Sequence, residues 1–253
     1  MHPDESTRDI DLRTLVDTVD VLRLLTLRGR RELREFTTYM VVFGLYPAVN
    51  IAAHLGLGRA FWLESLLVAF WVVTLPVAGV VLPSVVWAAV AGLTYGTYVG
   101  TQSGIATLLV LVAGIFGGMS LLYGYAHWKG RYRPARPWRL SVAPKVGWAW
   151  GVVMGGMGLL QGVLERHHGL TGADSVVLWG YAMGVGLFIS GIMAPGFFYL
   201  GLLGIFGVPL LSLWTVRGAY GLHGLMGLLM ALYALWLRRG TAEAAESELG
   251  FTN

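Results

Sequence analysis

The chain has 253 residues, of which 56% are hydrophobic and only 13% are charged. A soluble domain needs roughly 25% charged residues to cover its surface, so a water-soluble globular domain is excluded. The absence of cysteine excludes disulfides, thiolate metal ligands and a cysteine nucleophile. The net charge of +4 comes from basic residues that flank apolar runs, which indicates the positive-inside bias of membrane proteins rather than nucleic-acid binding.

The first 35 residues are predicted to form a cytoplasmic amphipathic and basic segment with no cleavable signal peptide. Between residues 9 and 35, leucine and valine recur at the spacing of an amphipathic helix. A basic collar then precedes the first apolar run and consists of Arg28, Arg30, Arg31 and Arg34. We expect the helix to lie on the membrane surface with this collar on anionic lipid headgroups. A docking site for a cytoplasmic or membrane partner is the alternative.

Eight apolar segments follow, each close to the length of about 20 residues that a bilayer-spanning helix requires. They are predicted at 36–57, 61–81, 83–101, 104–128, 146–164, 174–194, 196–216 and 219–238. Pro83 and Pro195 fall where helices begin, a position that tolerates proline. Pro47 and Pro209 fall inside helices and are expected to kink them. The sequence therefore predicts an all-α polytopic membrane bundle of about eight transmembrane helices.

The longest polar interruption is a connector at 129–145, which holds six of the 18 Lys and Arg residues. Seven more precede the first span and two follow the last one. Eight spans place all three basic groups on one side, which the positive-inside rule assigns to the cytoplasm. We therefore expect an integral protein of the cytoplasmic (inner) membrane with both termini in the cytoplasm, ending in a disordered acidic tail at 240–253.

The connector separates two predicted four-helix halves, 36–128 and 146–239, that resemble one another. Residues 78–93 align with 190–205, and residues 114–131 align with 221–238, with glycines and a proline in register. Two halves of the same orientation are common in transporters, whose sites lie between the halves. Chance similarity is the alternative, because the chain is rich in glycine and leucine.

Glycines four residues apart are typical of helices that pack closely. Three such pairs are Gly151/Gly155, Gly158/Gly162 and Gly180/Gly184. No charged residue falls in the middle of a predicted span. Since a buried charge usually marks a proton or ion relay, a carboxylate-based proton pump is disfavoured.

Ionisable residues gather instead at the predicted outer face. The candidate metal ligands there are His54, Glu64, Glu165, His167, His168, Asp174 and His223. Imidazole and carboxylate groups suit zinc, iron or manganese. The spacing matches no HExxH or similar motif, so loops that merely hold polar residues are the favoured interpretation.

Residues 92–125 carry a distinctive order of small and aromatic residues. After Gly92 and Thr94, the run contains Ser103, Ile105, Ala106, Ala113, Gly114, Phe116, Gly117, Met119, Ser120, Leu121, Tyr123, Gly124 and Tyr125, followed by basic residues. It resembles the third and fourth helices of the Bax inhibitor (transmembrane Bax inhibitor motif) family. The resemblance implies a cation leak, for calcium in particular, under pH control. The family's paired aspartates have no counterpart here, so no ion-binding residue carries over.

The leading functional hypothesis is permeation or transport of an ion or small solute through a glycine-rich bundle. One alternative is a structural or regulatory membrane subunit that docks a partner through residues 9–35. Another is a membrane enzyme that uses the outer histidines and carboxylates with a metal. Enzymatic activity is the less favoured class, and no organic cofactor is predicted.

Overall fold

The structure is a computed structural model that describes residues 5–132 and 141–250. Residues 1–4, 133–140 and 251–253 lie outside the described part of the chain. Within the described ranges every element is a helix and no strand occurs. The elements are α1 (Glu5–Leu57), α2 (Trp62–Ala78), α3 (Val81–Thr101), α4 (Gly104–Trp128), α5 (Ala143–His168), α6 (Gly172–Ser190), α7 (Pro195–Leu202), the π-helical segment η1 (Leu203–Gly207), α8 (Val208–Ser212) and α9 (Val216–Gly250).

The helices have the length and composition of membrane spans. Among the described residues, six helical segments are long and apolar enough to cross a bilayer, and α2 and Asp174–Ser190 of α6 are shorter apolar helices. Large apolar side chains cover the outside of the bundle, and Val81 and Leu213, for example, are 78% and 76% exposed. Because soluble monomers rarely expose such continuous apolar surface, lipid is the solvent for this surface. The predicted all-α polytopic membrane bundle is confirmed.

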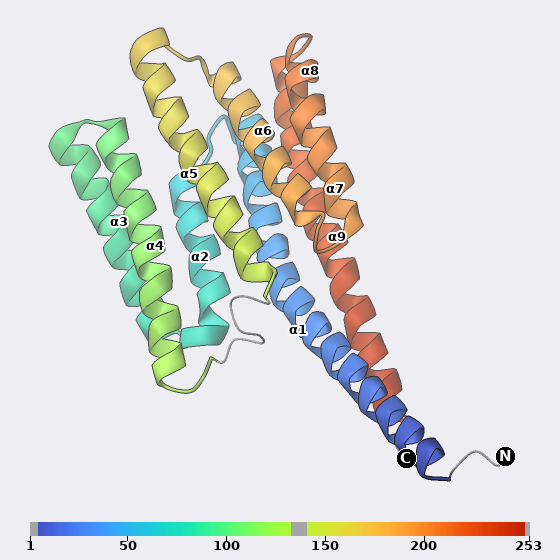
Figure 1. Cartoon of the computed structure of the whole chain (residues 1–253). Helices are drawn as coiled ribbons and strands as arrows, with labels where there is room; N and C mark the ends of the chain where they lie inside the picture. The colour runs from blue at the N-terminus through green and yellow to red at the C-terminus, as the bar shows by residue number, and fades with distance from the viewer. Residues whose placement is uncertain (1–4, 133–140, 251–253) are drawn as a thin grey trace.

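The helices run up and down, with α7, η1 and α8 forming one pass between them. The start of α1, the end of α9 and the junction of α4 with α5 lie toward the same end of the bundle, which we call the connector end (Figure 1). The turns between α1 and α2, α3 and α4, α5 and α6, and α8 and α9 lie toward the other end, which we call the opposite end. Eight passes therefore return the chain to the end from which it started.

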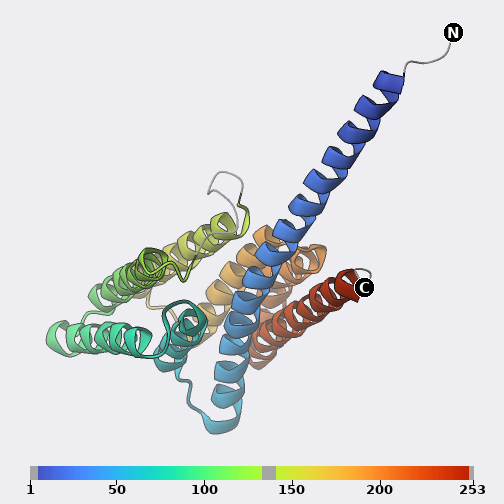
Figure 2. The same ribbon diagram turned by 90° about the horizontal axis from the view of Figure 1, so that it is seen from below.

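Two helices are longer than predicted. The first runs unbroken from Glu5 to Leu57, and its beginning extends alone beyond the bundle (Figure 2). The N-terminal segment is thus continuous with the first membrane span, and the contact of its basic collar with lipid headgroups stays a prediction. The last helix continues to Gly250, beyond residue 240, where the acidic tail was predicted to begin. Alanine and glutamate dominate residues 241–248, and both are strong helix formers.

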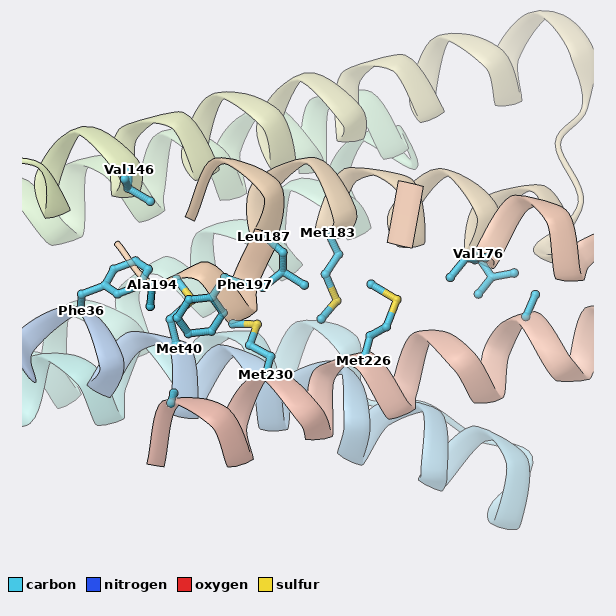
Figure 3. Packing of buried hydrophobic residues seen from close by; sticks show 13 residues of the cluster. Phe36, Met40, Val146, Val176, Met183, Leu187, Ala194, Phe197, Met226 and Met230 are labelled. Atoms are coloured by element: carbon cyan, nitrogen blue, oxygen red, sulfur yellow. The ribbon is translucent and has the colours of Figure 1, made fainter. Parts of the chain in front are cut away.

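A first apolar core is shared by five passes of the bundle. Phe36 and Met40 of α1 meet Leu187 of α6, Phe197 of α7 and Met230 of α9 (Figure 3). The rings of Phe36 and Phe197 lie edge to face with centroids 5.7 Å apart. Val146 brings the beginning of α5 into the same cluster. We call α1 and α5–α9 the large group.

A second core is formed by α2, α3 and α4, which we call the small group. Its buried members are Leu67, Ala78, Trp87, Val90 and Leu122. The predicted first half, 36–128, is thus divided in space, because α1 packs along α9 in the large group (Figure 1). The tandem repeat of four-helix halves stays a prediction.

Glycine allows two helix pairs to approach to backbone contact. A Cβ at Gly44 of α1 would lie 2.6 Å from the carbonyl oxygen of Gly227 in α9. A Cβ at Gly184 of α6 would lie 2.5 Å from the backbone nitrogen of Ile205 in η1. Gly180 likewise meets Val208, so both members of the predicted Gly180/Gly184 pair face a neighbouring helix.

The prolines have different effects. Pro195 is the first residue of α7, as predicted. Pro83 lies two residues inside α3, which begins at Val81. Pro209 is the second residue of α8, just after η1, whose wider π-helical turn relieves the clash of the proline ring with the carbonyl four residues earlier. Pro47 lies inside α1, which continues through it.

Candidate functional site

The seven predicted outer residues all lie toward the opposite end of the bundle, but they make different contacts there. His54 ends α1 and packs its ring on Tyr220 of α9, with centroids 5.0 Å apart. His167 and His168 are exposed at the end of α5. Glu64 stands in the first turn of α2 and accepts a hydrogen bond from the hydroxyl of Tyr95 in α3.

Glu165 and Asp174 take part in local hydrogen bonds at the turn between α5 and α6. Asp174 forms a capping box with Thr171, whose backbone N–H lies 2.9 Å from its carboxylate. Glu165 accepts a hydrogen bond of 2.6 Å from Gln161, which in turn accepts one from the indole of Trp179. Asp174 therefore caps the beginning of α6, and Glu165 makes an exposed hydrogen bond at the end of α5.

The predicted metal ligands do not converge. Among residues 5–132 and 141–250, as far as they are described, no group of three or more histidines, aspartates and glutamates is arranged to hold a metal ion. The helices bring the seven residues to one end of the bundle, but on different faces. The metal-site hypothesis receives no support from this geometry.

His223 differs from the other histidines because it is buried inside α9, with 5% of its surface exposed. Its Nδ1 has no hydrogen-bond partner within the described structure. An unsatisfied buried polar atom costs about 1–3 kcal/mol. Proteins keep such an unsatisfied buried group where it has a function, or where selection has not removed it.

We expect His223→Leu to raise the melting temperature of the detergent-solubilised protein, because leucine fills a similar volume without an unsatisfied nitrogen. The gain corresponds to about 1–3 kcal/mol, a few degrees for a chain of this size. The exposed His167→Leu is the matched control and should leave the melting temperature unchanged. A lower melting temperature for His223→Leu would show that the imidazole makes a hydrogen bond that the structure lacks.

The two helix groups meet along a boundary rich in aromatic side chains, which we call the seam. From α1, Phe43 packs on Phe70 of α2 with ring centroids 5.0 Å apart, and Tyr46 packs on Trp62 at 5.6 Å. One turn toward the connector end, the hydroxyl of Tyr39 hydrogen-bonds that of Tyr123 in α4. Residues 39, 43 and 46 follow helical spacing, so one face of α1 supplies this side of the seam.

The other side of the seam joins α4 to α5. Phe116 stacks on Trp148 with centroids 5.2 Å apart. Toward the opposite end, a Cβ at Gly158 would lie 3.1 Å from Leu108, and one at Gly162 would lie 3.2 Å from Ile105. The predicted pair Gly158/Gly162 therefore faces α4 and packs against the branched side chains of Leu108 and Ile105.

Hydrogen bonds close the seam at the opposite end. The amide of Asn50, which is 1% exposed, donates a bond of 2.6 Å to the hydroxyl of Ser65 in α2. Its oxygen accepts a bond of 2.9 Å from the backbone N–H of Phe61. Asn50 thus fixes the turn between α1 and α2 while satisfying its own polar atoms.

At the connector end, Glu32 of α1 binds the beginning of α5. It is 5% exposed, and its Oε1 accepts hydrogen bonds from the Ser141 hydroxyl at 2.6 Å and from the backbone N–H groups of Val142 at 2.5 Å and Ala143 at 2.8 Å. A helix N-terminus carries unpaired N–H groups and partial positive charge, which a carboxylate satisfies. One carboxylate therefore ties the connector to the first membrane span.

We expect Glu32→Ala to lower the free energy of unfolding by roughly 3–5 kcal/mol, because three donors lose a buried acceptor. Glu32→Gln should cost less, since an amide oxygen still accepts hydrogen bonds but carries no charge. Thermal unfolding in detergent measures both. Glu165→Ala is the control at an exposed carboxylate and should change stability little; equal losses for all three variants would contradict this role.

Sequence reasoning missed the seam and the Glu32 contact. The signals were present but weak: Asn50 is a lone amide in an apolar run, and Glu32 is an acid inside a basic collar. Neither residue shows its partner, because Ser65 lies beyond the turn that follows Asn50, and Ser141 lies 109 residues from Glu32.

Comparisons of this chain with protein families, with curated proteins and with solved structures gave no match. The resemblance of residues 92–125 to the Bax inhibitor family is not tested by these comparisons.

Proposed function

We propose that the chain moves an ion or a small solute across the bilayer by a change in the relative position of the large and small groups. The observation that carries the proposal is that two helix groups with separate cores share one narrow seam. Transporters built from two bundles commonly place the transport path between them. The cation leak implied by the Bax inhibitor resemblance agrees with this class of function.

The energies of the contacts favour motion at the seam over motion inside a group. Aromatic pairs contribute about 0.5–1.5 kcal/mol each beyond their buried area. Beyond their buried area, the ring pairs Phe43–Phe70, Tyr46–Trp62 and Phe116–Trp148 together supply only a few kcal/mol. Conformational states that differ by a few kcal/mol exchange readily, whereas the backbone contacts at Gly44 and Gly184 leave no room for sliding.

The proposal is tested with purified protein in liposomes loaded with a reporter for monovalent cations, calcium, anions or a small neutral solute. We expect flux of at least one class above that of empty vesicles. Vesicles that contain the less stable Glu32→Ala protein are the control for leakage around unfolded protein. Leakage should be greater in these vesicles, whereas transport should not. Absence of flux for all four classes would refute the proposal.

We further propose that the connector end faces the cytoplasm of a cell with an inner membrane, because three basic groups lie on that side. The chain has no cysteine, so single cysteines are clean probes. Lys129→Cys should be protected from an impermeant maleimide in intact cells, and His168→Cys should be labelled. Arg28, Arg30, Arg31 and Arg34 would then stand at anionic headgroups. Labelling at position 129 alone would reverse the orientation.

A second function is favoured by the shape of α1. The beginning of this helix extends past the bundle (Figure 2), where it offers a surface to a cytoplasmic or membrane partner. A structural or regulatory subunit would use it to dock that partner. Deletion of residues 5–27 distinguishes the two functions. If a stoichiometric partner is lost from native membranes while flux is unchanged, the docking function is supported. If neither the partner nor the flux is lost, the docking function is refuted.

A further inference from the structure

A hollow of about 360 Å³ opens between α2 and α3 on the outer surface of the small group. Leu67, Trp71, Trp87 and Ala91 form its apolar wall, and Glu64 and Tyr95 stand at one end. None of the seam residues named above lines this hollow, and its occupant is a question separate from the proposed function. Its surroundings are lipid-facing helices, so an occupant comes from the bilayer.

The wall of the hollow offers ring surfaces rather than hydrogen-bond donors. The indole N–H of Trp71 donates to the hydroxyl of Ser84 at 3.0 Å, and that of Trp87 donates to Thr74 at 3.0 Å. Both donors are thus satisfied within the protein. Trp87 is only 3% exposed, so Trp71 supplies most of the ring surface that faces the hollow, and this apolar surface suits an acyl chain.

The polar end stands at the level of the lipid headgroups. Glu64 lies two residues after Trp62, in the first turn of α2, and the helix then runs inward. From Glu64 to Trp71 the helix rises about 10 Å, so the hollow leads from a carboxylate toward an apolar floor. This order of polar and apolar groups matches that of a lipid.

The charge of Glu64 selects the kind of headgroup. Tyr95 donates to its Oε1, and within the described residues Glu64 has no basic partner in an ion pair. A carboxylate at the membrane interface repels lipids with a net negative charge and attracts an ammonium group. A primary ammonium also donates hydrogen bonds, and such charge-assisted bonds are about twice as strong as neutral ones.

We propose that this hollow binds a membrane lipid that carries a protonated primary amine. The ammonium group donates to Glu64, and one acyl chain lies against Trp71 and Trp87. The site discriminates between headgroups through Glu64 and holds the chain through its tryptophan wall.

Lipid retention measured by native mass spectrometry tests the proposal on the full-length protein. The protein is exchanged into mixed micelles with equal amounts of phosphatidylethanolamine, phosphatidylcholine and phosphatidylglycerol of identical acyl chains. We expect phosphatidylethanolamine to be retained roughly tenfold over phosphatidylglycerol, the ratio that one charge-assisted hydrogen bond supplies. Glu64→Gln should abolish this preference, and Tyr95→Phe should increase it because it frees the carboxylate from its internal donor.

Glu165→Gln is the matched control, since Glu165 is an exposed carboxylate toward the same end that does not line the hollow. It should retain the wild-type preference. Equal retention of phosphatidylethanolamine and phosphatidylcholine would overturn the assignment of a primary amine. A preference that survives Glu64→Gln would overturn the site itself.

Discussion

Gly184→Ala is expected to destabilise the protein by roughly 2–3 kcal/mol, at the upper end of the range for overpacked positions. The added methyl group would lie 2.5 Å from the nitrogen of Ile205 and 2.7 Å from the carbonyl carbon of Gly204. Both atoms belong to backbone, so no side-chain rotation relieves the clash. The helices α6 and η1 must separate, which opens the packing around Leu187 and Met226. Thermal unfolding in detergent should show a fall of several degrees.

Gly156→Ala is the matched control within a membrane helix. No atom outside its own helix lies within 4 Å of a Cβ built at Gly156. Alanine is the better helix former by about 1 kcal/mol, so this variant should be neutral or slightly more stable. If Gly184→Ala were as stable as Gly156→Ala, the close contact between α6 and η1 would be absent in the protein.

Much of the fold could be predicted because each apolar segment, taken alone, indicates a helix in the bilayer. The bounds of α4 agree with the predicted 104–128, because polar or turn-forming residues flank an apolar run. Pro195 marked the start of α7, since proline suits the first turn and little else. The lengths of α1 and α9 were underestimated because the prediction followed hydropathy, whereas helix propensity continues through the charged ends.

The candidate site was less predictable because it depends on pairs of residues distant in sequence. Placing His54, Glu64 and His223 toward one end required only a count of spans. Whether they converge depends on helix rotation, which the even spread of apolar residues around lipid-facing helices leaves undetermined. The contact of Glu32 with the start of α5 spans more than a hundred residues, and its distance in sequence hides it from any local pattern.

The assignment of α1 to the large group shows the same limit. Sequence similarity between the halves favoured a division at the connector. The observed division is set by Gly44 and Gly227, whose backbones touch. Sequence spacing identifies such glycines as able to pack, but it does not name the partner helix.

A disulfide across the seam is expected to reduce flux in liposomes to that of empty vesicles. The test pair is Leu108→Cys with Gly158→Cys, which joins α4 to α5. A Cβ at Gly158 would lie 3.7 Å from Cγ of Leu108, so side chains at these two positions meet across the seam, as the two halves of a disulfide must. The natural chain contains no cysteine, so no other bond forms on oxidation. Reduction should restore the flux.

The control disulfide lies inside the small group, between Val90→Cys in α3 and Gly114→Cys in α4. A Cβ at Gly114 would lie 3.6 Å from that of Val90, so this bond should form with little strain. If transport requires the two groups to move against each other, a bond within one group leaves flux largely intact, whereas a bond across the seam stops it. Full cross-linking of the test pair, seen as a gel shift, with undiminished flux would place the transport path away from the seam.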